Sequence, residues 1–124
     1  MDSGTNDHIT GVFFFLSLPV PAIIAQSVCF ADGSLSFVCH KGVMSLSPTI
    51  ILSFVLHVLN FAYNLLSVSR LVKQFNCAVI FLPSSCLLQD VSSKRWFGKG
   101  YERDGLYYFG DPPYELSSYS SASF

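Results

Sequence analysis

The chain has little charge for its size. Only 12% of its 124 residues are charged, about half the share of an average globular protein, while 51% are hydrophobic. The net charge of −1 excludes the strongly basic surface that many nucleic-acid-binding domains carry. At this length we expect one domain at most, and one that needs a partner surface or a membrane to cover its apolar side chains.

Several motifs that would specify a compartment or a chemistry are missing. The four cysteines have no C-x-x-C spacing, no Asn-x-Ser/Thr glycosylation site occurs, and no signal peptide is evident at the start. We therefore expect reduced thiols and a cytoplasmic location. The absence of Gly-x-Ser-x-Gly argues against a serine nucleophile.

Metal and cofactor motifs are also missing. His8, His40 and His57 share no metal-ligand spacing, and the adjacent Cys39 and His40 cannot by themselves present two ligands with normal geometry. We expect neither a metal nor a cofactor.

Two long uncharged stretches raise the possibility of a small membrane protein. No residue is charged from Ile9 to Ala31, and no Asp, Glu, Lys or Arg occurs from Gly42 to Ser69. Pro19 and Pro21 interrupt the first stretch, and its flank is acidic rather than basic. A membrane span therefore remains the least favoured alternative.

Short apolar runs separated by turn residues predict an all-β barrel or sandwich. Ser27–Phe30 and Leu35–Cys39 flank the turn residues Asp32-Gly33-Ser34, which predicts a hairpin. Pro48 marks a break, and 49–59 is rich in β-forming residues.

The pattern changes at Asn64. In NLLSVSRLVKQF the apolar residues recur every three to four positions, which predicts one short helix that Asn76 ends. The strands expected after it are 78–81, 86–89, 96–98 and 106–109, and the Pro/Ser-rich ending GDPPYELSSYSSASF is expected to be a disordered linker.

The order of several motifs resembles one known family. MDSGTNDHITG, ADGS, KGVMSLSPTIILSFVLHV, YNLLSVSRLV, CAVIFLPSSCLLQD and RDGLYYF follow one another as in the protease-to-pre-integrase stretch of copia-type retrotransposon Pol polyproteins. The resemblance divides the chain into a truncated retropepsin-like β-barrel (1–81), a β-rich connector towards the GAG-pre-integrase region (82–109) and the linker (110–124). It also implies a cytoplasmic, virus-like-particle setting.

The resemblance to retroviral aspartic proteases implies a site. It makes Asp2-Ser3-Gly4 the catalytic loop, with Asn64-Leu65-Leu66 opening the helix 62 positions after Asp2. Such enzymes need two carboxylates that share a proton, so one tripeptide per chain implies a homodimer acting on peptide bonds of a polyprotein. The turn Asp32-Gly33-Ser34 would be the flap over the substrate.

The sequence departs from that family at positions near the implied site. Thr5 replaces the usual Ala, Asn6 replaces a substrate-contacting Asp, and Ala62 replaces a Gly. Only Met1 precedes Asp2, where the family has an apolar strand. We therefore expect a fragment that has lost activity, with a non-catalytic interaction or dimerisation module as the alternative.

Four of the seven basic residues lie within ten positions, among aromatic residues. They are Lys94, Arg95, Lys99 and Arg103. Basic and aromatic residues together can bind single-stranded nucleic acid, but acidic side chains occur among them, and a solvated hairpin with its aromatic residues on the core face explains the pattern better. We expect no specific nucleic-acid site.

Overall fold

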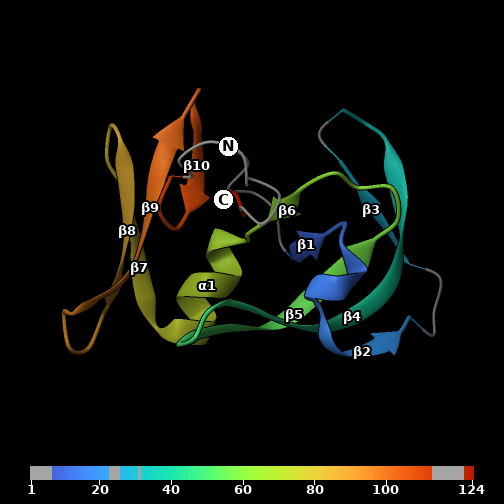
Figure 1. Cartoon of the computed structure of the whole chain (residues 1–124), viewed down its shortest axis with the longest axis horizontal. Coiled ribbons are helices and arrows are strands. Elements are labelled where there is room, and N and C mark those ends of the chain that lie inside the picture. Colours follow the sequence, from blue (N-terminus) through green and yellow to red (C-terminus); the bar gives the residue numbers. More distant parts are fainter. Residues whose placement is uncertain (1–6, 23–25, 31, 113–121) are drawn as a thin grey trace. The chain divides into compact units, whose positions relative to one another are not determined.

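The computed structural model describes residues 7–22, 26–30, 32–112 and 122–124. These residues are mostly strand, with one short α-helix and one 3-10 turn (Figure 1). The elements are β1 (His8–Thr10), η1 (Phe13–Phe15), β2 (Ser17–Pro21), β3 (Ser27–Cys29), β4 (Leu35–Ser47), β5 (Ile50–Val58), β6 (Asn64–Leu65), α1 (Val68–Phe75), β7 (Cys77–Phe81), β8 (Ser85–Asp90), β9 (Trp96–Arg103) and β10 (Leu106–Phe109). The predicted all-β class with one short helix is confirmed.

The chain divides into two compact units. The N-terminal unit is Asp7–Asn64, and the C-terminal unit contains the described residues from Leu65 onward. The expected division at 81/82 stays a prediction, although β7 and β8, on either side of it, pair within one sheet.

The sheet of the N-terminal unit is built around a long hairpin. β4 and β5 are antiparallel, β2 pairs with the outer edge of β4, and β1 runs parallel to β5 on the other side. β2 is an edge strand, which is where a strand tolerates prolines such as Pro19 and Pro21 because they donate no ladder hydrogen bond. β3 pairs with the start of β4, so the predicted hairpin at 27–39 is confirmed.

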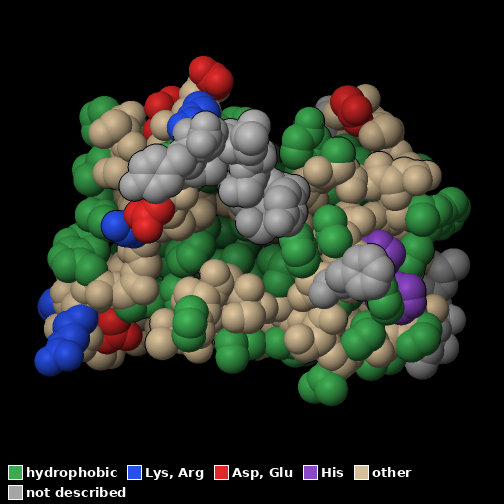
Figure 2. All heavy atoms as spheres, viewed as in Figure 1, with side chains coloured by type: hydrophobic (Ala, Val, Ile, Leu, Met, Phe, Trp, Pro, Cys, Tyr) green, Lys and Arg blue, Asp and Glu red, His purple; other side chains and the backbone are tan. Residues whose placement is uncertain are grey.

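Buried side chains of β5 supply much of this unit's core, although the alternation breaks in mid-strand, where the exposed Ser53 and Phe54 precede the buried Val55 and Leu56. Leu52, Val55 and Val58 are fully buried, whereas Phe54, at an intervening position, is 62% exposed. Other apolar side chains of the buried core are Ile9, Leu16, Val38, Met44, Ile50 and Leu56. Large exposed apolar residues nevertheless remain, and Figure 2 shows hydrophobic side chains on the surface over both units.

The C-terminal unit contains a four-stranded antiparallel meander in the order β10-β9-β8-β7. Its strands overlap the four strands expected from the sequence, and β9 extends five residues beyond Gly98, to Arg103. Cys86 and Leu88 of β8 are fully buried. Gly100 of β9 faces this core, since a Cβ there would collide with the Tyr108 carbonyl oxygen and the Cys86 sulfur.

Helix α1 begins at Val68, later than the predicted start at Asn64. Asn64 and Leu65 form the short strand β6, the Leu66 N–H donates to the Ser123 carbonyl at 2.6 Å, and the backbone stays extended through Ser67. Ser67 caps the helix instead, its hydroxyl accepting from the Arg70 N–H at 3.2 Å. Asn76 ends it with a left-handed φ of 49°, as predicted.

The last three residues differ from the expected linker. Ala122, Ser123 and Phe124 are buried, and Phe124 is only 1% exposed. Backbone hydrogen bonds join them to β10, from the Phe109 N–H to Ala122 and from the Phe124 N–H to Tyr107. The phenylalanine ring packs edge-on against Phe81 at 6.0 Å. The aromatic residue at the end of this Ser-rich segment therefore buries apolar surface that the composition alone does not reveal. Residues 113–121 lie outside the described part.

No helix in the described part of the chain has the length and hydropathy needed to cross a membrane.

Candidate functional site

The proposed catalytic tripeptide Asp2-Ser3-Gly4 lies outside the described residues. The strand that follows it in sequence, β1, is inside them and is buried along its whole length. His8 is 1% and Thr10 0% exposed, and the strand pairs with β5 through the registers His8–Val55 and Thr10–His57. The segment after the tripeptide is therefore anchored in the core of the N-terminal unit.

A buried hydrogen bond joins this strand to Asn64. The Thr10 hydroxyl donates to the Asn64 Oδ1 at 2.5 Å and accepts from the Val12 N–H at 3.1 Å. Thr10 thus uses its hydroxyl as both donor and acceptor, which removes the penalty of burying it. The structure brings together β1 and Asn64, two segments 54 positions apart.

The chain crosses itself closely beside this bond. A Cβ on Gly11 would collide with the Phe61 carbonyl, and the Gly11 N–H donates to the Tyr63 carbonyl at 3.2 Å. Glycine is therefore the residue that fits where β1 ends.

The flap candidate Asp32-Gly33-Ser34 is the exposed turn between β3 and β4. The Asp32 carboxylate accepts from the Ser34 hydroxyl at 2.6 Å and from its N–H at 2.8 Å, and these bonds hold the pKa of that carboxyl below its ordinary value. Gly33 has a φ of 87°, which a side chain would strain. The turn is well formed, and its role as a flap stays a proposal.

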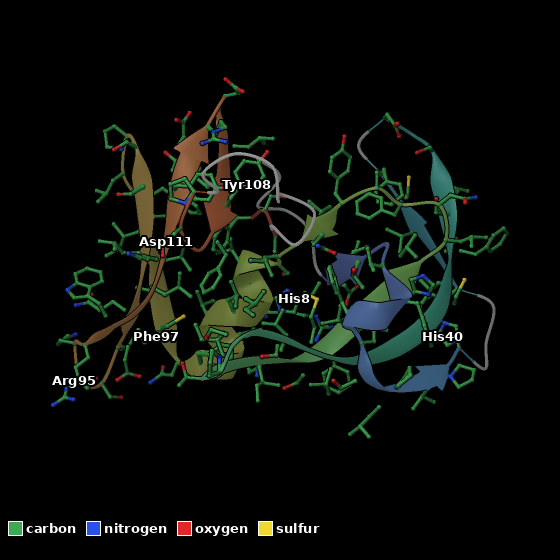
Figure 3. The ribbon with its side chains drawn as sticks, in the orientation of Figure 1. His8, His40, Arg95, Phe97, Tyr108 and Asp111 are labelled. Carbon is green, nitrogen blue, oxygen red and sulfur yellow. The ribbon has the colours of Figure 1, made fainter. Side chains whose placement is uncertain are left out.

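The structure also pairs two histidines that the sequence analysis does not join. His40 of β4 and His57 of β5 are direct cross-strand partners, with their Nδ1 atoms 3.2 Å apart. The Phe13 ring lies 4.6 Å from the His40 ring and 5.6 Å from the His57 ring. Figure 3 labels His40, and Figure 2 shows histidine side chains at the surface there.

Burial and the neighbouring His40 lower the pKa of His57 below its ordinary value, burial being the larger cause. Within the described part, no three His, Cys, Asp or Glu side chains gather as a metal site.

The basic and aromatic segment forms most of β9, an inner strand of the meander that pairs with β8 and β10. Tyr101 and Tyr108 stack at 5.3 Å, and the Arg103 guanidinium lies 5.5 Å from the Tyr101 ring. Lys99 forms an exposed ion pair with Asp111 at 2.9 Å. Arg103 and Lys99 therefore have an aromatic and an acidic neighbour, respectively. The expected absence of a nucleic-acid site stays a prediction.

Comparisons with known proteins give the family context. The chain is 36% identical, over 110 residues, to the retrovirus-related Pol polyproteins from transposons RE2 and RE1 of Arabidopsis thaliana. Each match includes 86% of this chain. The chain is homologous to a segment of retrotransposon Pol polyproteins. This confirms the retrotransposon Pol resemblance seen in the sequence.

The chain spans only 8% of the length of these Pol polyproteins. No protein-family model and no solved structure matches it.

Proposed function

We propose that the chain derives from the aspartic protease region of a copia-type Pol polyprotein and leads towards its pre-integrase segment. The observation that carries this proposal is the relationship to Pol polyproteins over 86% of the chain, combined with the Asp-Ser-Gly tripeptide ahead of β1. The ancestral reaction would be hydrolysis of peptide bonds within the polyprotein.

The contact between β1 and Asn64 supports the same proposal. The resemblance pairs an Asp-Ser/Thr-Gly loop with a later Asn-Leu-Leu segment, and the buried Thr10–Asn64 bond joins the strand after that tripeptide to that segment. The all-β fold and the exposed β3–β4 hairpin agree with a flap-bearing barrel.

The proposed ancestral site needs two copies of the chain. Two carboxylates about 3 Å apart share a proton, so that one activates water while the other protonates the carbonyl oxygen. One chain offers Asp2 alone in an Asp-Ser-Gly context, so the proposed assembly is a homodimer with Asp2 of each copy at the shared centre.

We propose further that this chain no longer cleaves peptides. Thr5, Asn6 and Ala62 replace residues that the family uses around the loop and at the substrate, and such a site depends on positioning to about 0.5 Å.

Cross-linking through Asp2 tests the origin and the dimer. In a Cys29→Ser/Cys39→Ser background, an Asp2→Cys variant is expected to form an intermolecular disulfide under mild oxidation, because the two positions face each other across the dimer. A Ser93→Cys variant is the matched control, since Ser93 lies in the exposed turn between β8 and β9. Equal cross-linking of the two variants, or none at Asp2, would contradict the proposal.

Peptide cleavage tests the loss of activity separately. The wild-type chain and an Asp2→Asn variant are expected to leave a peptide mixture equally intact at about pH 5, where an aspartic dyad would be active. Cleavage by the wild type that the variant lacks would show a working protease.

A second candidate function is a non-catalytic association module. The observation that favours it is the exposed apolar surface of β4, where Leu35 and Phe37 are each 66% exposed. This role predicts a dimer, seen by light scattering, whose Asp2→Cys variant does not cross-link.

A further inference from the structure

The His40 and His57 rings face each other nitrogen to nitrogen. Their Nδ1 atoms are 3.2 Å apart and their ring centres are 5.4 Å apart. The difference is close to twice the distance from the centre of an imidazole ring to its atoms, so both Nδ1 atoms lie near the line that joins the ring centres. Each Nδ1 therefore points towards the other, which is the geometry of an N–H···N hydrogen bond.

This geometry fits a shared proton rather than a metal ion. Since each Nδ1 points at the other, an ion bound along both lone pairs would lie on the line between them and, with imidazole–zinc bonds of about 2.0–2.1 Å, would need the nitrogens about 4 Å apart. The described residues also place no third His, Cys, Asp or Glu ligand with the pair. A hydrogen bond needs one protonated and one bare Nδ1, so one ring is the donor and the other the acceptor.

The surroundings offer the pair little electrostatic compensation. The only Asp, Glu, Lys or Arg residues of the N-terminal unit are Asp7, Asp32 and Lys41. None is on β5, η1 or β2, and β4 carries only Lys41.

The remaining titratable groups near the pair are not carboxylates. β1, which pairs with β5 beside His57, carries His8, and Cys39 precedes His40 on β4. The one charged neighbour that shifts the pKa of His57 is His40, and the described residues hold no cluster of three His, Cys, Asp or Glu that could bind a metal ion.

We propose that the His40–His57 pair is a proton-operated clasp of the N-terminal unit. When the pair is neutral or carries one added proton, its N–H···N hydrogen bond holds β4 to β5 beneath the Phe13 ring. A second proton opens it, because two N–H donors and two positive charges then face each other at 3.2 Å. This inference does not depend on the proposed protease ancestry.

The pH dependence of the clasp has a definite sign. The folded pair resists its second proton, whereas in the unfolded chain both histidines take up protons near their ordinary pKa of about 6.5. The unfolded state therefore binds more protons at low pH. The stabilisation is present above about pH 6.5 and is lost as the pH falls through the lowered pKa of His57 in the folded chain.

An NMR titration of the imidazole resonances of the full chain tests the proposal. In the wild type, the second proton is expected to bind at least about tenfold more weakly than the first, so the two steps separate by about one pH unit. In His40→Gln, His57 should titrate in one step and lose the part of its pKa lowering that His40 causes. In His57→Gln, the remaining ring should also give a single step. The signal lost in each variant assigns the resonances and separates them from His8.

A Lys41→Gln variant is the matched control for long-range charge. It removes the only Lys or Arg of the N-terminal unit, next to His40, and is expected to leave the two-step titration unchanged. If both histidines of the wild type titrate together and keep the pKa values of the single variants, no clasp exists.

Hydrogen exchange at η1 provides an independent readout. The Leu16 N–H donates to the Phe13 carbonyl at 3.0 Å, and its protection should fall below about pH 6 in the wild type but not in His57→Gln. Protection that follows the same pH course in both proteins would overturn the conformational part of the proposal.

Discussion

At the scale of single residues, burial decides what the four cysteines can do. Cys86 is fully buried, and burial raises the pKa of its thiol to about 11, while burial also raises the pKa of Cys77. Cys29, by contrast, is exposed on β3. The thiolate is the reactive form, so the four thiols differ in reactivity although the sequence presents them alike.

Alkylation should reveal this difference. At about pH 8, iodoacetamide is expected to modify Cys29 in the folded chain while Cys86 stays unmodified, because its raised pKa alone lowers the thiolate fraction about a hundredfold. Peptide mass spectrometry over time would measure both rates. In denaturant the two should react alike, and modification of Cys86 at the Cys29 rate before unfolding would contradict the assignment.

At the scale of elements, α1 depends on its caps, because eight residues are too few to be helical alone. Replacing Ser67 by Ala removes the acceptor for the Arg70 N–H and should lower the free energy of unfolding by about 1 kcal/mol. Chemical denaturation would measure the change. Ser69→Ala is the matched control inside the helix and should be neutral or slightly stabilising. Equal losses for both variants would show that the cap is unimportant.

The elements also show how far the sequence predicts this fold. The helix end at Asn76 and the β3–β4 hairpin follow from local turn chemistry, so the sequence alone predicts both. The helix start does not, because Asn64 is held by a tertiary hydrogen bond to Thr10. The burial of Phe124 likewise depends on contacts with distant strands.

The histidine pair lies between these cases. Ser47 pairs with Ile50 across Pro48-Thr49, and counting outward from that turn joins His40 to His57. Yet the strand register shifts near Met44–Leu52 and returns to its first value by Gly42–Val55, and no residue pattern predicts this irregularity. The sequence could suggest this pairing but could not establish it. The placement of Asp2 stays a prediction from resemblance.

At the scale of the whole molecule, the division into two units raises the question of how the chain unfolds. Each unit has its own buried side chains on central strands, such as Leu52 on β5 and Leu88 on β8, both 0% exposed. Units of about 60 residues bury only about 60% of their unfolded surface and are marginally stable. A single substitution can therefore remove much of the free energy of unfolding of one unit.

Leu52→Ala and Leu88→Ala form a matched pair that tests this independence. Each should cost about 2–5 kcal/mol through lost burial and a cavity. Hydrogen exchange read by mass spectrometry should show Leu52→Ala lowering protection across 7–64 while the meander 77–109 keeps most of its protection, and Leu88→Ala doing the reverse. A uniform loss across the chain in both variants would mean that the units fold as one cooperative body. Local loss would mean that the N-terminal unit can loosen, as the histidine clasp requires, while the meander stays folded.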